Sequence, residues 1–347
     1  MASYTEVLFD ELPGNNGNLG VITLNRPEVL NALNQSMVKA IHAQLQQWKD
    51  AKQIKAVVIR AAEGRAFCAG GDLRDMYDRV KEHNLSASSF FHDEYQLNQY
   101  IFHFPKPYIA FLDGITMGGG VGLSIHGSHR IVTQQTLFAM PETGIGFYPD
   151  VGGTYFLTKI PCKIGYYLGL TGTRILSDDC VSLGVAQAKI LRETFPALLA
   201  ELQNATFSQD PSQSVTEIIN EFAIPIVDSP FIEQGKEIET CFSSSTIEEV
   251  MAVVGRSQSD LCQKAASLFA NKSPTSLKVT LQALQKSEKL SFDACMQQEY
   301  QMTCRFLKEH DFAEGIRAVI IDKDQKPQWQ PSSLESVTPQ MVNAYFK

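Results

Sequence analysis

The sequence lacks several features that define other classes of protein. It has no excess of positive charge, because 38 acidic residues outnumber 30 basic ones and give a formal net charge of −8. A nucleic-acid partner, which would favour a basic face, is therefore not expected. Its seven cysteines are scattered and contain no Cys-x-x-Cys pair, so neither a zinc site nor a disulfide framework is indicated. With 44% hydrophobic residues, the chain has the composition of an ordinary globular protein.

A long apolar run and a basic leader are also missing. The most apolar long stretch, residues 109–125, contains Asp113 and five glycines, and it is too short and too broken to span a bilayer. The first Lys or Arg of the chain is Arg26, which is unlike a secretory signal or an Arg-rich transit peptide. Because dispersed cysteines fit a reducing compartment, we expect a cytoplasmic protein with no membrane partner.

Three common catalytic or nucleotide-binding motifs are not matched by the sequence. No Gly-Lys-Ser/Thr triplet exists for a P-loop, and the glycine run 118–122 is followed by Leu123 where a dinucleotide fingerprint needs Gly. The run from Gly122 through Ser124 ends in His126 instead of the closing Gly of a nucleophile elbow, so Ser124 is predicted to be a helix residue. Cys68 has no identifiable His partner and is expected to pack.

Strands and helices alternate in the first part of the chain. Period-2 and short apolar runs predict strands at 4–9, 19–24, 56–59, 108–112, 130–133 and 136–139, with a hairpin loop at 13–17. Helical spacing predicts helices at 37–48, with Ser36 as N-cap, and then at 73–80, 90–102 and 119–125. After about residue 155 helical periodicity dominates and no convincing strand is found. The pattern predicts an α/β core over residues 1–200 and a helical region over 201–347.

Two glycine turns follow predicted strands and precede predicted helices. The first is Arg65–Asp72 and contains Gly70 and Gly71; the second is Asp113–Gly122 and contains three consecutive glycines. Bare backbone N–H groups at such turns can approach an oxyanion. Either turn alone is more often an ordinary tight turn. The pair could supply one N–H each to a single oxyanion hole.

Two carboxylates, Glu142 and Asp150, stand eight positions apart in the Pro/Gly-rich and mostly apolar stretch 138–153. Burying a carboxylate is costly, so two of them in such a stretch are unlike ordinary solvated loop acids. Neighbouring carboxylates in an apolar setting can be driven to different protonation states and so to different roles. The stretch is a candidate acid/base site.

These motifs in this order resemble the crotonase (enoyl-CoA hydratase/isomerase) superfamily, over essentially the whole chain. The stretches that carry the resemblance are 24–33, 66–72, 118–122 and 170–174. Three further stretches look like the CoA-thioester hydrolases of that superfamily: 114–127, 138–153 and 311–324. The last of these also accounts for the long helical extension.

The resemblance implies a crotonase-like spiral of ββα units with a helical C-terminal region. It implies hydrolysis of a short 3-hydroxyacyl-CoA, with Glu142 and Asp150 as catalytic residues and the N–H groups of Gly71 and Gly119 as the oxyanion hole. Glu94 matches a residue that contacts the substrate 3-hydroxyl. The implied partner is a small acyl-CoA; CoA belongs to the substrate, and neither a separate cofactor nor a metal is expected.

One position departs from the hydratase pattern. Hydratases of the superfamily carry a catalytic Glu just after the triple glycine, where this chain has Gly122, and they usually carry Gly where it has Asp150. Without the first carboxylate, hydration loses half of its acid/base pair, which favours hydrolysis. An isomerase working with Glu142 alone and a non-catalytic CoA-binding protein remain the alternatives.

Overall fold

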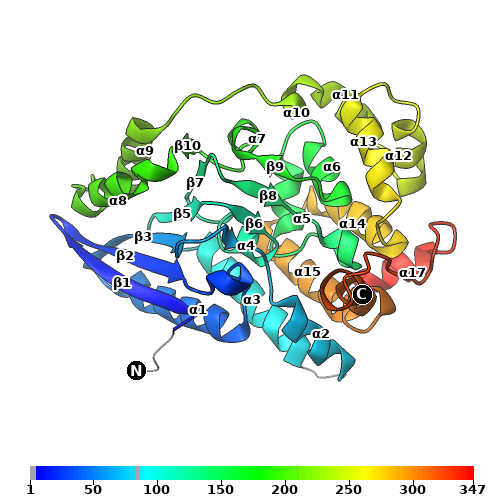
Figure 1. The fold of residues 1–347 in the computed structure, drawn as a ribbon, viewed down its shortest axis with the longest axis horizontal. Helices are drawn as coiled ribbons and strands as arrows, with labels where there is room; N and C mark the ends of the chain where they lie inside the picture. Colours follow the sequence, from blue (N-terminus) through cyan, green and yellow to red (C-terminus); the bar gives the residue numbers. More distant parts are fainter. Residues whose placement is uncertain (1–4, 83–85, 209) are drawn as a thin grey trace. The chain divides into compact units, whose positions relative to one another are not determined.

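The computed structural model describes residues 5–82, 86–208 and 210–347 (Figure 1). The chain forms two compact units, each assembled from three segments. Unit 1 comprises Met1–Gly71, Gln96–Phe138 and Ile175–Asp228, and unit 2 comprises Asp72–Tyr95, Ala139–Arg174 and Ser229–Lys347. The division into a core of residues 1–200 and a helical region of 201–347 stays a prediction.

Unit 1 contains a six-stranded sheet in the order β1-β2-β3-β5-β7-β10 (Figure 1). Its strands are β1 Val7–Gly14, β2 Gly17–Leu24, β3 Ile54–Ala61, β5 Tyr108–Leu112, β7 His129–Thr133 and β10 Ala188–Ile190. β1 and β2 form an antiparallel hairpin that closes at Gly14 and Gly17, as predicted, and every later neighbour pairs in parallel. Parallel strands covered on both faces read as continuous apolar runs, and all five residues of β5 are buried.

A second sheet in the order β4-β6-β8-β9 accompanies the first. Its strands are β4 Ala66–Cys68, β6 Ile115–Met117, β8 Leu137–Ala139 and β9 Ile175–Leu176. β4, β6 and β8 each follow β3, β5 and β7 after a short connection, so each turn of the chain contributes one strand to each sheet before a helical segment begins. This order is the predicted spiral of ββα units.

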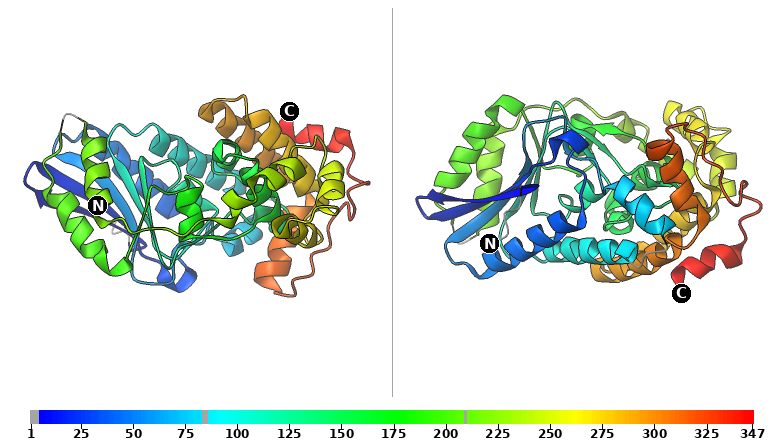
Figure 2. Two further views of the ribbon diagram at one scale, coloured as in Figure 1. Left: turned by 90° about the horizontal axis from the view of Figure 1, so that it is seen from above. Right: turned by 60° about the horizontal axis from the view of Figure 1, so that its bottom comes forward.

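Two helices pack on one face of the six-stranded sheet, as Figure 2 shows. They are α8 Phe195–Asn204 and α9 Pro211–Phe222. Their residues Leu198, Leu202, Val215 and Ile219 share an apolar core with alternate residues of the strands: Leu19, Val21, Ala56, Val58, Ile109, Phe111 and Ile131. Gly20 points to the opposite face, where the ring of Trp48 from α1 (Gln35–Asp50) packs against it.

The N-cap of α1 differs from the prediction. Asn34 has extended backbone angles, and its side chain accepts the Met37 N–H at 2.9 Å. Ser36 lies in the first turn of the helix, and its hydroxyl donates to Asn34 Oδ1 at 2.7 Å. The prediction of Ser36 as N-cap was wrong because Asn34 is an equally good capping residue placed two positions earlier.

The expectation that no strand follows residue 155 was also wrong. β9 and β10 are two and three residues long, which is too short to carry a detectable period. β10 extends the six-stranded sheet by pairing with β7. Further short helical segments of unit 1 are η1 Pro27–Val29, α4 Gly119–Gly122, α7 Ser177–Ser182 and η4 Arg192–Thr194.

Unit 2 is largely helical. Its segments before residue 229 are α2 Leu73–Lys81, the first part of α3 Ser86–Phe102, η2 Glu142–Ile145, α5 Gly153–Phe156, η3 Leu157–Lys159 and α6 Ile164–Thr171. The later ones are α10 Pro230–Glu233, α11 Gly235–Phe242, α12 Ile247–Val254, α13 Asp260–Phe269, α14 Pro274–Ser287, α15 Phe292–Phe306, α16 His310–Ile316, the π-helical η5 Arg317–Ile321, α17 Pro339–Asn343 and η6 Ala344–Phe346. None of the helices in the described ranges has the length and apolarity needed to cross a membrane.

The helices of unit 2 begin at well-defined caps. Ser259, Ser273 and Ser291 each accept a backbone N–H from the first turn of α13, α14 and α15. Thr246 and Glu249 form a reciprocal capping box at α12. These caps satisfy N–H groups that a helix leaves unpaired, which explains how a sequence rich in Ser and Thr divides this region into separate helices.

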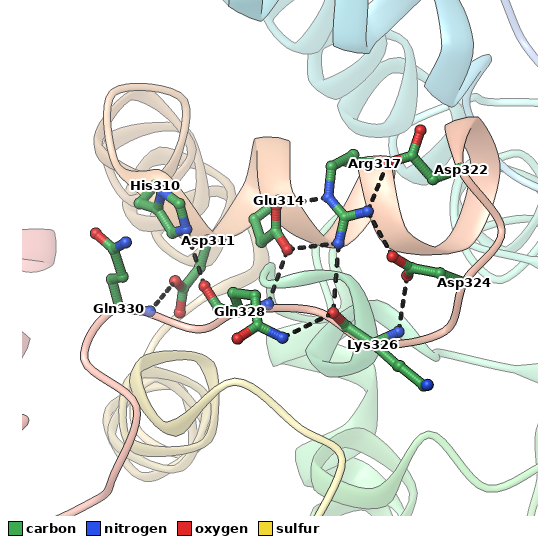
Figure 3. Close-up of polar contacts among 9 residues, drawn as sticks. All are labelled: His310, Asp311, Glu314, Arg317, Asp322, Asp324, Lys326, Gln328 and Gln330. Atoms are coloured by element: carbon green, nitrogen blue, oxygen red, sulfur yellow. Dashed lines mark hydrogen bonds and ion pairs between the residues drawn. The ribbon is translucent and has the colours of Figure 1, made fainter.

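The segment after η5 is tied back to α16 by charged groups, drawn in Figure 3. The Arg317 guanidinium donates two bonds of 2.8 Å to Glu314, one to Asp322 at 2.6 Å and one to Asp324 at 2.8 Å. The Gln330 N–H donates to Asp311 Oδ1 at 2.8 Å. A bidentate Arg pair with additional carboxylates is the strongest form of surface ion pairing, and here it fixes the course of a chain segment that forms no helix.

Candidate active site

The two glycine turns identified in the sequence lie next to each other in unit 1. Leu33 N–H donates to Gly70 O at 2.8 Å, and Leu33 and Gly71 form an isolated parallel bridge. Gly70 has φ +109°, and a methyl group built on it would lie 3.8 Å from Gly119 N. A methyl group on Gly120 would lie 2.8 Å from Cys68 Cβ. Glycine is required at the first turn by the positive φ of Gly70, and at the second turn by the close contact of Gly120 with Cys68.

Ser124, which follows the second turn, is not exposed. Gly119 is the first residue of α4, after Gly118 with φ +49°. Ser124 is fully buried just after α4, and its hydroxyl donates to Gly120 O at 2.9 Å and lies 3.1 Å from Val121 O. A hydroxyl bonded back to its own helical turn is not presented as a nucleophile. Gly122, the position where hydratases carry a Glu, is buried within α4.

Unit 2 brings together the three predicted acidic residues, here called the carboxylate cluster: Glu94, Glu142 and Asp150. Glu94 lies on α3, Glu142 opens η2, and Asp150 lies in the loop before α5. All three are buried. Neighbouring carboxylates act on two of the three: the pKa of Glu94 is raised first by burial and then by Asp150, and the pKa of Glu142 is raised by burial, Asp150 and Glu94. The cluster therefore retains protons well above the pH at which exposed acids lose them.

Asp150 is bonded by a tyrosine hydroxyl within the carboxylate cluster. Burial raises its pKa to about 7, and a hydrogen bond of 2.7 Å from the Tyr95 hydroxyl to its Oδ2 opposes that rise. The pKa of Glu142 is also raised well above its usual range, by burial and by Asp150. Carboxyl groups with raised pKa values are suited to acid/base chemistry.

Two oxygen atoms of the carboxylate cluster lack a hydrogen-bond partner among the described residues. Across the described residues, Glu94 Oε1 and Glu142 Oε2 are buried and have no hydrogen-bond partner. Buried polar atoms in native proteins are nearly always bonded, so each exception calls for an explanation. A substrate or a water molecule is the simplest partner for both atoms.

Lys272 lies beside Glu142, and the sequence gave no indication of it. Its Nζ would be 3.2 Å from a methyl group on Gly144 and 3.0 Å from one on Gly172, and the Ser273 N–H donates to Thr143 O at 3.2 Å. Burial lowers the pKa of Lys272 to about 8, while Glu142 opposes that shift. The positive charge of Lys272 in turn lowers the pKa of Glu142. Lys272 is therefore a cation that can compensate a charged Glu142.

The turn that carries Glu142 is packed against α16. Gly146 ends η2 with φ +70°, and its N–H bonds to Glu142 O. A methyl group on Gly146 would overlap the backbone carbonyl of Asp311 and lie 2.9 Å from its Cβ. A methyl group on Gly315 would in turn overlap the Ile145 carbonyl and lie 2.5 Å from its Cα. The stretch 311–324, recognised in the sequence by resemblance alone, thus packs closely against η2, with Gly146 on one side of the contact and Gly315 on the other.

Within the described part of the chain, no group of three or more His, Cys, Asp or Glu is arranged to hold a metal ion. The two glycine turns belong to unit 1, and the carboxylate cluster with Lys272 belongs to unit 2. The site residues that the sequence missed are Tyr95, Lys272 and Glu299, whose carboxyl group accepts the Gly152 N–H at 2.7 Å. Of these, only Tyr95 adjoins a predicted site residue.

The chain belongs to the enoyl-CoA hydratase/isomerase family, whose model matches residues 19–346. Its relatives include the protein named mitochondrial 3-hydroxyisobutyryl-CoA hydrolase from Danio rerio, which is 42% identical over 347 residues and aligns with 99% of this chain and 89% of its own length. The protein of the same name from Homo sapiens is 40% identical and aligns with 100% of this chain and 91% of its own length.

Solved structures support the fold assignment. A structure described as a carnitinyl-CoA dehydratase from Mycobacterium thermoresistibile superimposes with a TM-score of 0.90 at 36% identity, and covers 99% of this chain and 97% of its own. One described as an enoyl-CoA hydratase from Rhodobacter sphaeroides gives a TM-score of 0.86 at 35% identity, and covers 98% and 97%. The predicted crotonase-like α/β fold is confirmed.

One expectation is contradicted by the comparison. The sequence was expected to be that of a cytoplasmic protein, but the relatives from Danio rerio, Xenopus laevis and Homo sapiens are each named as mitochondrial enzymes. The inference failed because dispersed, reduced cysteines are compatible with more than one compartment.

Proposed function

We propose that this protein hydrolyses 3-hydroxyisobutyryl-CoA to 3-hydroxyisobutyrate and CoA. The observation that carries the proposal is the burial of Glu142 and Asp150 in one cluster, together with Gly122 at the position of the first hydratase carboxylate. The names of the relatives that align over nearly the whole chain support the same activity. The proposed setting is valine degradation in mitochondria.

The proposal assigns the thioester carbonyl to the backbone N–H groups of Gly71 and Gly119. These donors would polarise the carbonyl and stabilise the tetrahedral intermediate, and such a donor typically contributes roughly 10²–10³-fold in rate. The adjacency of the two turns supports this assignment, since a methyl group on Gly120 would overlap the backbone of Cys68 in the first turn. No metal or separate cofactor is proposed, because the reaction needs only polarisation of the carbonyl and proton transfer.

Glu142 is proposed to react with the polarised carbonyl in one of two ways. It either attacks the carbonyl carbon, forming a mixed anhydride and releasing the CoA thiolate, or removes a proton from an attacking water. Both routes need Glu142 in its charged form, which burial disfavours and Lys272 favours. Asp150 would orient the water or transfer a proton to the leaving thiolate.

Glu94 is proposed to bind the 3-hydroxyl group of the substrate. Its Oε1 atom is buried and lacks a partner among the described residues, and burial raises the pKa of its carboxyl group. A protonated or charged carboxyl can bond a hydroxyl as donor or as acceptor. An acyl-CoA without a 3-hydroxyl would leave this atom unbonded and would therefore bind less well.

The second candidate is hydration or isomerisation of an enoyl-CoA. The two similar solved structures favour it, since they are described as a dehydratase and a hydratase. Gly122 argues against hydration because that reaction uses a pair of carboxylates as acid and base, and this chain lacks one of them. An isomerase needs one carboxylate, so Glu142 alone would suffice.

The test is a thiol-release assay with wild type and Glu142→Gln over a panel of short acyl-CoA esters. We expect release from 3-hydroxyisobutyryl-CoA and 3-hydroxypropionyl-CoA, slower release from isobutyryl-CoA, and none with the variant. The same samples are incubated with crotonyl-CoA, and its loss is followed by the absorbance of the enoyl group. Faster loss of crotonyl-CoA than release of thiol would establish the second candidate instead. CoA binding without turnover of any ester would identify a non-catalytic protein.

A single turnover in ¹⁸O-labelled water distinguishes the two routes through Glu142. Unlabelled product from the first turnover shows direct attack, because one product oxygen then comes from the Glu142 side chain. Labelled product together with failure to trap an adduct with hydroxylamine shows general-base catalysis. We expect direct attack, since the neighbourhood of Glu142 offers a second acid and neither Ser124 nor Cys68 is presented as a nucleophile.

A further inference from the structure

The loop that carries Asp150 has an unfavourable backbone conformation. Val151, the next residue, has φ +51° and is buried, and Gly152 follows with φ +82°. A positive φ is unusual for any residue other than glycine and a clear outlier for a β-branched one. Such conformations are unfavourable and persist only where the surroundings enforce them.

Glu299 of α15 enforces this loop. Its Oε2 accepts the Gly152 N–H at 2.7 Å, and its Oε1 accepts both the N–H and the hydroxyl of Thr154, at 3.0 and 2.6 Å. Glu299 is fully buried, and burial raises its pKa to about 8. All three bonds are donated to the carboxyl group, so it acts as a clamp on the residues just after Asp150.

Tyr95 and its neighbours fix the carboxylate of Asp150. The Tyr95 hydroxyl donates its only proton to Asp150 Oδ2 at 2.7 Å, and the Tyr148 hydroxyl donates to Glu299 O at 2.6 Å. The Thr303 hydroxyl lies 2.7 Å from the Tyr95 oxygen and 2.8 Å from the Tyr148 oxygen. With the two tyrosine protons committed, Thr303 can donate to either oxygen, so each hydroxyl in the chain has a partner.

We propose that Tyr95 and Glu299 are positioning residues for the hydrolysis: Tyr95 orients and bonds the Asp150 carboxylate, and Glu299 holds the strained loop that presents it. The expected effect on kcat rests on the proposed function. The hydrogen bond between Tyr95 and Asp150 can be tested without any turnover. Neither residue needs to touch the substrate. Both act through Asp150.

The alternative is that this network only fills the interior of unit 2. The two possibilities differ in what happens to the proton of Asp150. The other titratable groups around Asp150 come from its own loop and from the elements around it. They are Glu94 and Tyr95 on α3, Tyr148 in the loop itself, Glu142 on η2, Lys272 before α14 and Glu299 on α15. Burial and neighbouring acids raise the pKa of Tyr95 well above its usual range, so it donates at every working pH.

The decisive variant is Tyr95→Phe, which removes one hydroxyl and keeps the ring. The bond from Tyr95 stabilises the charged form of Asp150, so the Asp150 pKa must rise when the bond is lost. We expect the limb of the kcat profile that reports Asp150 to move upward by about one pH unit, with kcat lowered roughly tenfold and KM nearly unchanged. Tyr167→Phe is the matched control, because Tyr167 is equally buried and its ring packs against Phe231 and Phe242.

A ¹³C NMR titration of the aspartate carboxyl carbons, with the Asp150 signal assigned from Asp150→Asn, measures the same shift in the resting protein. A higher Asp150 pKa in Tyr95→Phe and an unchanged one in Tyr167→Phe support the inference. Equal profiles and equal titrations in wild type and Tyr95→Phe would overturn it. If wild type releases no thiol, the proposed function fails, yet the titration still decides whether Tyr95 bonds Asp150.

Glu299 is tested by Glu299→Gln and by the milder Thr154→Val, which removes one of the three bonds. A Gln amide can no longer accept on both atoms, so one loop N–H loses its acceptor. We expect a fall in kcat that exceeds any change in KM, about tenfold or more for Glu299→Gln and a few-fold for Thr154→Val. If Glu299→Gln does not fold, Thr154→Val carries the test. Unchanged kcat in a folded variant would show that the clamp is not needed for catalysis.

Discussion

Replacing Gly146 by alanine tests whether α16 supports the turn that carries Glu142. Gly146 has φ +70°, and the added methyl group would meet the backbone carbonyl and the Cβ of Asp311. Backbone atoms cannot rotate out of the way as the end of a flexible side chain can. Either η2 or α16 must therefore move, and Glu142 lies four residues before Gly146 in that turn.

The matched control is Gly184→Ala. Gly184 has nearly the same backbone angle, φ +73°, but nothing lies within 4 Å of its added methyl group. Both variants carry the cost of a left-handed alanine, about 1–2 kcal/mol. Gly146→Ala alone carries the additional cost of overpacking, typically about 1–3 kcal/mol. The difference between the two variants isolates the contact with Asp311.

Thermal unfolding and thiol release together measure the effect. We expect the Tm of Gly146→Ala to lie several degrees below that of Gly184→Ala, since about 1 kcal/mol shifts Tm by roughly 2–4 °C in a large domain. Displacement of Glu142 should lower kcat by ~10-fold or more, whereas Gly184→Ala should retain wild-type kcat. Equal Tm and equal kcat for the two variants would refute the argument that Asp311 and Gly146 are in close contact.

Asp150→Asn should lower kcat more than it changes KM. It should also stabilise the fold at high pH. The pKa of Asp150 is about 7 in the folded state and about 4 in the unfolded state, so the wild type loses stability as the pH rises from about 4 to about 7. The gain in Tm of the variant should therefore grow over this pH range and stay constant above it. A Tm difference that does not change with pH would contradict this assignment. Lys272→Met should lower activity at neutral pH and move the acidic limb of the rate profile upward, because the cation that favours charged Glu142 is gone; an unmoved limb would show that Lys272 does not act on Glu142. Gly122→Glu should at most add trace hydration of crotonyl-CoA, and efficient hydration by the variant would mean that the remaining groups are already those of a hydratase.

The sequence predicted those parts of the fold and site whose signals are local. The hairpin of β1 and β2 follows from its loop at 13–17, and Glu142 and Asp150 stand out because they lie eight residues apart in one apolar loop. The glycine turns were found as a pair by their position after strands, and the structure places them side by side. Short-range spacing was sufficient for each of these features.

The remaining site residues could not be found in this way. Tyr95 bonds a residue 55 positions away, and Glu299 bonds Gly152 across 147 positions. Lys272 precedes a Ser-Pro helix start and looks like any solvated lysine in a turn. Such contacts depend on how helices of unit 2 pack, and no periodicity or motif in a single sequence specifies that packing.

The support that α15 and α16 give to the loops of Glu142 and Asp150 has a consequence for the synthesis of the protein. Glu142 and Asp150 leave the ribosome long before Glu299 and Gly315, by roughly 10–30 s at usual elongation rates. During that interval the Val151 turn has no carboxylate to hold it and η2 has no helix behind it. The nascent chain can form the sheet of unit 1 while its reaction centre is still incomplete. Messages that terminate before α15 would therefore yield chains that retain both acidic residues and lack activity.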